Sequence, residues 1–345
     1  MKKQYHIHAA LAVLLITMLA CSFSAPSPGP IETPVHLQPY TPSFQVITIP
    51  TGIDPTAPSQ VPMYFLDTGG GHYLLYVYET QKLVYDGREL YSGQLADVYG
   101  GSSAALSHNG LHYAYVIPGT DGLDFNDLYV DGTKVETAQH LLQPALTDDA
   151  HYFYTACSSA TGFSGSCLFK DGTDIFLAEH GILEYWVNVD GTTHYALLRD
   201  PQSLVRNGEV IYEGTELAHK SFSPNGVHYA YVSHDENGMQ HLIVDGDVVR
   251  SSTALFVNQV TDLGSYCAWD SANQLVFING VEFPVQGDSQ IKCYINDDAS
   301  HSLIHDVGTW LLDGNPVQFP ELSPADEIEN VEMKGDTWYV YRLVE

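Results

Sequence analysis

The sequence predicts an all-β protein: a β-propeller of eight blades whose last blade is closed by a strand from the N-terminal end of the chain. Three observations lead to this prediction. A unit of roughly 40 residues recurs along the chain, every copy contains short apolar runs separated by turn residues, and one apolar run near the N-terminus stands apart from the repeats. A ring of seven blades with loose chain ends is the alternative.

The second half of each unit is predicted to be a β-hairpin. Two short apolar, β-branched runs are joined by Asp-Gly or Asn-Gly, which suit a two-residue type I′ turn because both central positions need a positive φ. Successive turns lie 34 to 45 residues apart. The turns begin at Asp86, Asp131, Asp171, Asn207, Asp245, Asn279 and Asp313.

The first half of each unit is also a predicted hairpin, whose second strand usually opens with His-Tyr. We count eight first hairpins and seven second hairpins. Four short strands per unit make a propeller blade. Recurrence at the blade period predicts a structural role for these histidines, with each imidazole bonding a neighbouring strand or turn. They are His72, His112, His151, His194, His228 and His301.

The turn inside the first hairpin carries a family resemblance. Residues 223–226 read SPNG and residues 107–110 read SHNG. Together with the apolar strand that follows, this resembles the TolB-type, WD40-like propeller repeat, over roughly residues 62–345. The resemblance implies a propeller and, in general, a binding module, an accessory domain or occasionally an enzyme. Most copies here lack the Ser-Pro of that pattern.

The first 43 residues are predicted to lie outside the fold. Residues 1–21 read as a bacterial lipoprotein signal peptide, with two lysines, an apolar run and the lipobox MLAC ending at Cys21. Residues 22–43 are rich in Pro and Ser and should form an extended tether. The sequence therefore predicts export, a lipid on Cys21 and an anchor on the extracytoplasmic side of a membrane, with residues 44–345 as one propeller domain.

The isolated apolar run is Phe44–Ile49 (FQVITI). We expect this strand to pair with the C-terminal hairpin over 331–344, closing the ring by placing both chain ends in one blade. Such pairing would also explain why the last unit lacks a second hairpin.

The net charge of −29 disfavours nucleic acid and anionic lipid headgroups as direct partners. A protein or carbohydrate of the cell envelope remains as the expected partner, the membrane is reached through the lipid alone, and the chain is expected to be a monomer. No resident cofactor is predicted.

Four cysteines remain after Cys21 is set aside, an even number in an exported protein. Cys157 and Cys167 flank the loop between the two hairpins of the third unit, where a disulfide could link neighbouring strands. Cys267 and Cys293 lie on first-hairpin strands of adjacent units, where a bridge could join two blades. We favour the first pairing; four free thiols are the alternative. No Cys-x-x-Cys occurs, so no metal site is predicted.

By the geometry that the resemblance implies, ligands bind on the face that carries the loops between blades and between hairpins. Those loops vary in length, as functional loops do. The acidic candidates for Ca²⁺ or another cation are Asp121, Asp124 and Asp127, although their spacing is not that of an EF-hand. His234, Asp235 and Glu236 occupy the equivalent loop of the fifth unit.

No catalytic residue is predicted, because the chain has no Gly-x-Ser-x-Gly, His-Glu-x-x-His, phosphate loop or dinucleotide fingerprint. The expected function is a non-catalytic binding module. One alternative is a hydrolase or lyase acting on an extracellular sugar or lactone, which would require carboxylates and a histidine to converge on an open channel. A structural component of the envelope is the other.

Overall fold

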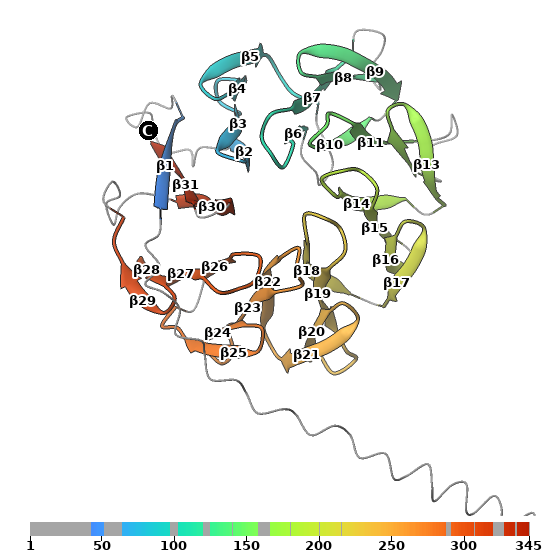
Figure 1. Cartoon of the computed structure of the whole chain (residues 1–345). Helices are drawn as coiled ribbons and strands as arrows, with labels where there is room; N and C mark the ends of the chain where they lie inside the picture. The colour runs from blue at the N-terminus through green and yellow to red at the C-terminus, as the bar shows by residue number, and fades with distance from the viewer. Residues whose placement is uncertain are drawn as a thin grey trace, which may run out of the picture. The chain divides into compact units, whose positions relative to one another are not determined.

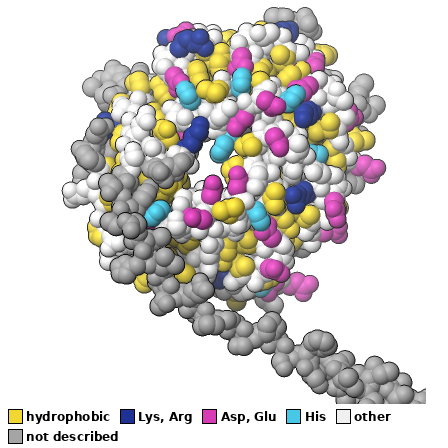
Figure 2. Space-filling model, in the orientation of Figure 1, with side chains coloured by type: hydrophobic (Ala, Val, Ile, Leu, Met, Phe, Trp, Pro, Cys, Tyr) yellow, Lys and Arg dark blue, Asp and Glu magenta, His cyan; other side chains and the backbone are white. Residues whose placement is uncertain are grey.

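Consecutive strands pair into eight small sheets, which are arranged in a ring (Figure 1). The space-filling view shows the opening of a channel at the centre of this ring (Figure 2). The computed structural model describes residues 43–51, 64–96, 103–119, 125–139, 141–157, 166–179, 181–199, 201–214, 216–287, 291–306, 308–319, 328–334 and 337–344. Seven sheets have four strands hydrogen-bonded in chain order, and the eighth has three. The predicted eight-bladed propeller is confirmed and the seven-bladed alternative is wrong.

Blades 1 to 4 follow one another along the chain. Their strands are β2 (Tyr64–Gly69), β3 (His72–Val77), β4 (Lys82–Tyr85) and β5 (Arg88–Ser92); β6 (Ala104–Leu106), β7 (Tyr113–Pro118), β8 (Phe125–Val130) and β9 (Thr133–Gln139); β10 (Leu142–Leu146), β11 (Tyr152–Cys157), β12 (Ser166–Lys170) and β13 (Thr173–Ala178); and β14 (Ile182–Val187), β15 (His194–Arg199), β16 (Gln202–Arg206) and β17 (Glu209–Glu213).

Blades 5 to 7 continue the series, and blade 8 combines the two ends of the ring. Their strands are β18 (Leu217–Phe222), β19 (Tyr229–His234), β20 (Gln240–Val244) and β21 (Asp247–Ser252); β22 (Leu255–Val260), β23 (Tyr266–Asp270), β24 (Leu275–Ile278) and β25 (Val281–Pro284); β26 (Lys292–Ile295), β27 (Ser302–Asp306), β28 (Thr309–Leu312) and β29 (Asn315–Val317); and β30 (Ile328–Lys334), β31 (Thr337–Val344) and β1 (Ser43–Pro50).

Blade 8 closes the ring as the sequence predicts. β1 pairs with β31 in parallel, from Ser43 opposite Thr337 to Pro50 opposite Val344. β31 pairs antiparallel with β30, so β1 takes the place of the second hairpin that the last unit lacks. Ile49 is fully buried between this blade and blade 1.

The outer turns have the predicted backbone. The Asp or Asn that begins each of the seven turns has a φ of 46° to 51°, and the following glycine has a φ of 75° to 91°. These are the positive values that a type I′ turn requires. Each turn therefore fixes the register between the third and fourth strands of its blade.

The hydrophobic core lies between blades rather than in one central mass. The residues of each buried cluster come from two neighbouring blades; one cluster, for example, joins Tyr195 and Leu204 of blade 4 to Tyr231 and Ile243 of blade 5. The seven clusters join every pair of neighbouring blades except blades 3 and 4, so most sheets bury both faces against their neighbours. First strands of most adjacent blades contact each other.

Five of the six repeat histidines bond the turn of their own blade. His72 Nδ1 lies 2.6 Å from Asp86 Oδ2, while the other carboxylate oxygen accepts a hydrogen bond from the Tyr73 backbone N–H at 3.0 Å. The same pairing occurs in blades 2, 3, 5 and 7. The prediction of a structural role is confirmed for these five.

His194 does not occupy the predicted position. In blade 2, His112 donates its backbone N–H to Ser107 at the start of the turn. In blade 4 the same bond runs from Thr193 to Asn188, so Thr193 is the equivalent of His112 and His194 lies one residue later. Among the described residues, its buried Nε2 has no hydrogen-bond partner, and burial lowers the pKa of His194.

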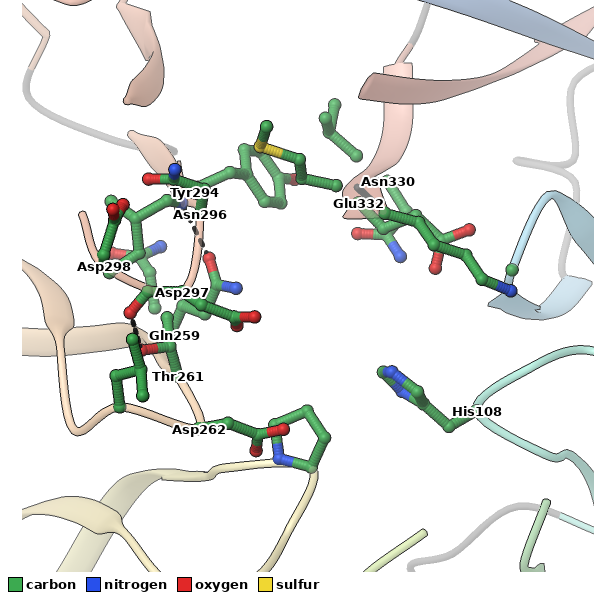
Figure 3. A pocket seen from close by; sticks show the side chains of 18 of the residues that line it. His108, Gln259, Thr261, Asp262, Tyr294, Asn296, Asp297, Asp298, Asn330 and Glu332 are labelled. Carbon is green, nitrogen blue, oxygen red and sulfur yellow. Dashed lines mark hydrogen bonds between the residues drawn. The ribbon is translucent and has the colours of Figure 1, made fainter. Parts of the chain in front are cut away.

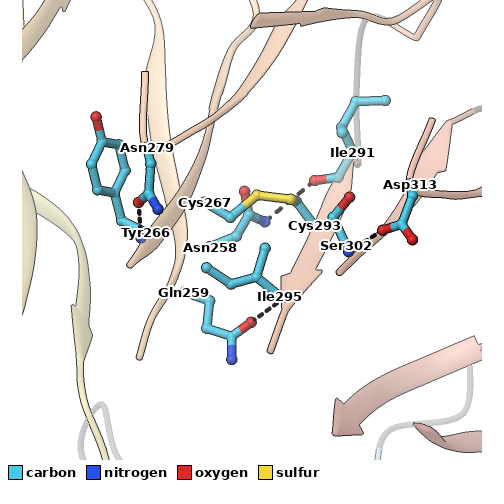
Figure 4. Close-up of a disulfide and its surroundings, with 10 residues drawn as sticks. All are labelled: Asn258, Gln259, Tyr266, Cys267, Asn279, Ile291, Cys293, Ile295, Ser302 and Asp313. Carbon is cyan, nitrogen blue, oxygen red and sulfur yellow. Dashed lines mark hydrogen bonds between the residues drawn. A yellow bond between two sulfur atoms is a disulfide. The ribbon is translucent and has the colours of Figure 1, made fainter. Parts of the chain in front are cut away.

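A disulfide joins Cys267 of β23 to Cys293 of β26 and thereby links blades 6 and 7 (Figure 4). Their Cα atoms are 6.1 Å apart and both side chains are buried. In blade 3, Cys167 lies opposite Ala156, while Cys157 lies opposite Ser166. The Cys157 side chain is outside the described residues, so the first pairing stays a prediction.

Residues 1–42 lie outside the described residues. The signal peptide, the lipidation of Cys21 and the tether therefore stay predictions.

Candidate functional site

A large cavity lies at one mouth of the central channel. It measures about 690 Å³ and is lined by first strands and by the turns that follow them, mainly in blades 6, 7 and 8. Acidic and histidine side chains surround the central opening on this face (Figure 2). A cavity of this size can hold a small ligand or the side chains of a partner protein.

Hydrogen bonds between successive turns hold the rim of this cavity. Asn109 donates its backbone N–H to Asp148 Oδ1 at 2.7 Å and its side-chain amide to the Asp148 carbonyl at 3.1 Å. Asn225 bonds Asp262 in the same two ways, at 2.7 Å and 3.1 Å. Since each bond joins neighbouring blades, the rim is a preorganised ring of turns rather than a set of independent loops.

The turns also approach one another closely. Gly110 has a φ of +75°, and a Cβ at this position would meet the Gly69 carbonyl oxygen of blade 1 at 2.0 Å. Glycine is therefore required here both for the backbone conformation and for the contact between blades.

Negative charge dominates the lining. Asp262 and Asp297 lie on one side of the cavity, with Asp298 beside them and Glu332 on the wall from blade 8 (Figure 3). Burial, together with the carboxylates of Asp262 and Asp298, raises the pKa of Asp297, and His108 opposes this rise. No hydrogen bond to the Asp297 carboxylate occurs within the described part of the chain. Its charge is therefore available to a cationic ligand.

The basic side chains of the lining are His108 and Lys334. His108 projects into the cavity from the side opposite the aspartates (Figure 3). Two basic groups stand against the acidic residues Asp148, Asp262, Asp297, Asp298 and Glu332. The mouth therefore attracts cations and repels anions.

A further carboxylate lies deeper, on the innermost strand of blade 1. Asp67 accepts hydrogen bonds from the backbone N–H groups of Thr68 at 3.0 Å and Leu106 at 2.8 Å. Burial raises its pKa to about 6, although both hydrogen bonds favour the charged form. The same carboxylate ties blade 1 to blade 2.

Of the loop residues predicted as ligand candidates, the four that the structure describes, Asp127, His234, Asp235 and Glu236, do not line this cavity. Asp127 is buried and is bonded by Lys134 Nζ at 2.7 Å and Thr137 Oγ1 at 2.7 Å, which is a structural arrangement. Although burial alone would raise the pKa of Asp127, these two partners lower it. Asp121 and Asp124 lie outside the described residues.

The second predicted loop joins β19 to β20, at the ends of these strands remote from the mouth. His234 Nε2 lies 2.7 Å from Gln240, and Asp235 accepts the backbone N–H groups of Asn237 and Met239 at 2.8 and 2.9 Å. Glu236 is exposed. Asp235 thus stabilises its own loop, and a ligand role for these residues stays a prediction.

The residues of the mouth were missed by the sequence analysis, although a signal exists. Aspartate recurs in the turn of the first hairpin, in TDDA (147–150), NVDG (188–191), TDLG (261–264) and NDDA (296–299). The sequence-based prediction instead placed binding on the opposite face, at the loops between blades and between hairpins, and gave these turns no ligand role.

No protein-family model matches the chain, and the search of curated proteins found no relative. Within the described residues, no three His, Cys, Asp or Glu side chains are grouped so that they could hold a metal ion. The same residues contain no helix long and apolar enough to cross a membrane.

Proposed function

We propose that this chain is a membrane-anchored, extracytoplasmic binding module without catalytic activity, and that it takes a basic protein partner at the acidic mouth of its channel. The lipobox and the tether support the location. The observation that carries the proposal is the cavity of about 690 Å³, in which five acidic residues face His108 and Lys334 on a rim of bonded turns.

Apolar side chains on the same turns favour a protein over a carbohydrate. Leu111, Val227 and Leu263 are 58%, 50% and 67% exposed, and each belongs to or directly follows a first-hairpin turn. Protein interfaces combine apolar contacts with complementary charge, which steers association. A basic protein that contacts these tips would place cationic side chains over the mouth.

The test compares two variants that remove the same number of charges. Asp262→Asn/Asp297→Asn changes the mouth, whereas the control Asp235→Asn/Glu236→Gln changes the β19–β20 loop at the other end of blade 5. Each variant of residues 43–345 serves as bait for an envelope extract. We expect the mouth variant to lose at least about tenfold in affinity for the retained protein, because charge pairs at close range contribute more than about 1.4 kcal/mol, and the control to bind as the wild type does.

Equal retention by both variants would contradict the proposal. If the wild type retains a glycan instead of a protein, and the mouth variant does not retain this glycan, the proposed site stands and its partner is a carbohydrate.

A hydrolase or lyase is the second candidate, because carboxylates and a histidine do converge on the channel. A carboxyl group with a pKa of about 6, as in Asp67, suits general acid catalysis. A screen of sugars and lactones tests this candidate: Asp67→Asn should reduce any turnover by about a hundredfold or more. A screen without turnover, or turnover unchanged by Asp67→Asn, would reject it.

A further inference from the structure

In the described part of the chain, blade 8 has one strand fewer than the other blades. Seven sheets pair four strands, whereas blade 8 pairs β30, β31 and β1, with β1 on the outside (Figure 1). No described strand pairs with the outer edge of β1. The other seven blades show what occupies this place in each of them: a fourth strand, paired antiparallel with the third.

The outer edge of β1 presents a regular row of backbone hydrogen-bonding groups. β1 pairs with β31 in parallel and without a bulge, and the Thr51 N–H donates to the Val344 carbonyl at 2.9 Å. In a parallel pair, every second residue of a strand bonds its partner. Counting back from Thr51, the N–H and C=O groups of Phe44, Val46 and Thr48 therefore point away from β31.

This edge lacks the features that keep outer strands from pairing with other chains, namely charges, proline and bulges. Every fourth strand of the other blades contains a charged residue or a proline, and five of them have a bulge or irregularity against the third strand. β1 reads SFQVITIP, with no charge and no proline before its last residue. Its edge is therefore a template for a further strand.

The side chains of β1 also leave apolar surface to be covered. Phe44, Val46 and Ile47 are only half-buried. The ring of Phe44 meets that of Phe319 edge-to-face, with centroids 4.6 Å apart, in the cluster shared with blade 7. Ile47 belongs to the cluster shared with blade 1. A strand beside β1 would cover the remaining exposed parts of these side chains and gain from their burial.

The neighbouring parts of this chain are poorly suited to fill the place. Between residues 26 and 42, no more than four consecutive residues lack a proline, which cannot donate to a ladder. The twelve residues 52–63 connect the third strand of blade 8 to the first strand of blade 1. Thr51 and Tyr64 both lie at strand ends remote from the mouth, so these residues are too few to run along β1 to Phe44 and return as well.

We propose that the outer edge of β1 binds an extended segment of a partner protein, which adds a fourth strand antiparallel to β1 and completes blade 8. Backbone bonds to Phe44, Val46 and Thr48 supply the binding, so the segment needs alternating β-branched or aromatic residues without proline. A second copy of this chain is disfavoured as the occupant, because each copy carries a net charge of −29. The site is separate from the acidic mouth and does not depend on the docking proposed above.

A fluorescent octapeptide of alternating threonine and valine, with a lysine at each end for solubility, is the probe for residues 43–345. Its control carries a methyl group on every backbone amide, so it keeps the side chains but cannot donate on either edge. We expect the probe to bind saturably with a Kd below about 1 mM, and the control to bind at least about tenfold more weakly. Bound probe should slow amide exchange at 43–51 and leave the mouth turns at 107–110 and 261–264 unchanged.

Two substitutions at one position isolate a single backbone donor. Thr48→Pro removes the outward N–H, whereas Thr48→Val keeps it. Both remove the hydroxyl that accepts a hydrogen bond from Arg342 Nε at 2.9 Å. Thr48→Pro should weaken the probe about threefold to tenfold, and Thr48→Val should bind it as the wild type does. Asp262→Asn/Asp297→Asn should also bind it as the wild type does, which separates the edge from the mouth.

Equal binding of the probe and its methylated control would overturn the inference, because backbone pairing would then have no part. This comparison uses the wild type, so it decides even if Thr48→Pro fails to fold. Equal binding by the two Thr48 variants, loss of the probe in the mouth variant, or no saturation up to about 10 mM would overturn it as well.

Sedimentation of residues 43–345 tests the other occupant. A dimer that the probe dissociates would assign the edge to a second copy of the chain and reject the partner segment. If the probe fails while the mouth variant still loses the captured protein, the docking function stands and only the strand site is rejected.

Discussion

Replacing Ile49 by alanine should destabilise the propeller at the blade that joins its two chain ends. Ile49 is fully buried, in a cluster with Leu75 and Val77 of blade 1 and Tyr341 of β31. Its strand, β1, is held by parallel pairing along the whole of β31. Loss of the side chain therefore leaves a cavity at the junction of three chain segments that are far apart in sequence.

The magnitude follows from burial and from the size of the domain. An Ile→Ala change at a fully buried site costs about 2–5 kcal/mol, because the transfer energy of the lost groups adds to that of the cavity. The propeller has about 300 residues, and the entropy of unfolding at the melting temperature is about 2.1 cal/mol/K per residue. The melting temperature should therefore fall by about 3–8 °C.

Calorimetry of residues 43–345 and of two variants measures this effect. Gln45 lies on the same strand but is exposed, so Gln45→Ala should stay within about 0.5 kcal/mol of the wild type. Equal melting temperatures for Ile49→Ala and Gln45→Ala would refute the closure by β1. Deleting Phe44–Ile49 altogether should lower the melting temperature at least as much as Ile49→Ala does.

Three further predictions concern charge and location. Arg250→Ala should cost about 3–5 kcal/mol of stability at neutral pH, because it leaves the buried Asp270 carboxylate without its cation. Although burial favours a higher pKa for Asp270, hydrogen bonds from Asn273, Ser252 and Arg250 hold this pKa below normal, so denaturation curves should show the cost shrinking as the pH falls below about 4. A cost independent of pH would contradict the pairing. The pKa of Asp67 is raised to about 6, so its contribution to stability is present below about pH 4 and is lost as the pH rises through 6. The free energy of unfolding of Asp67→Asn should therefore rise by about 1–2 kcal/mol relative to that of the wild type between pH 4 and 7. A difference between the two proteins that does not change with pH would count against burial of the charge. Cys21→Ser should move the protein from the membrane fraction to the soluble fraction, and continued membrane association would rule out the lipobox as the anchor.

The architecture was readable from the sequence because its determinants are local and periodic. Asp-Gly and Asn-Gly mark the outer turns through their positive φ, and the alternating run at Phe44–Ile49 could be assigned to the closing blade since no other strand remained for it. His194 was misplaced because the turn after Asn188 puts Thr193, not the histidine, at the repeat position. A one-residue difference of this kind cannot be seen in the residue pattern alone.

The site was less predictable because it depends on side chains brought together across the ring. Asp148, Asp262 and Asp297 belong to three different blades and meet only after closure. The sequence shows an aspartate in four of the first-hairpin turns, but it does not show which of these turns line one cavity. The disulfide between Cys267 and Cys293 likewise depends on the contact between two blades, whereas the pairing favoured from sequence lay within one blade.

Hydrogen–deuterium exchange of the propeller with its captured partner tests most directly whether the acidic mouth is the binding face. The account predicts slower exchange in the first-hairpin turns at 107–110, 223–226, 261–264 and 296–299, with no change at 233–240. Slower exchange at 233–240, with the four turns unchanged, would contradict it and would return the binding site to the opposite face.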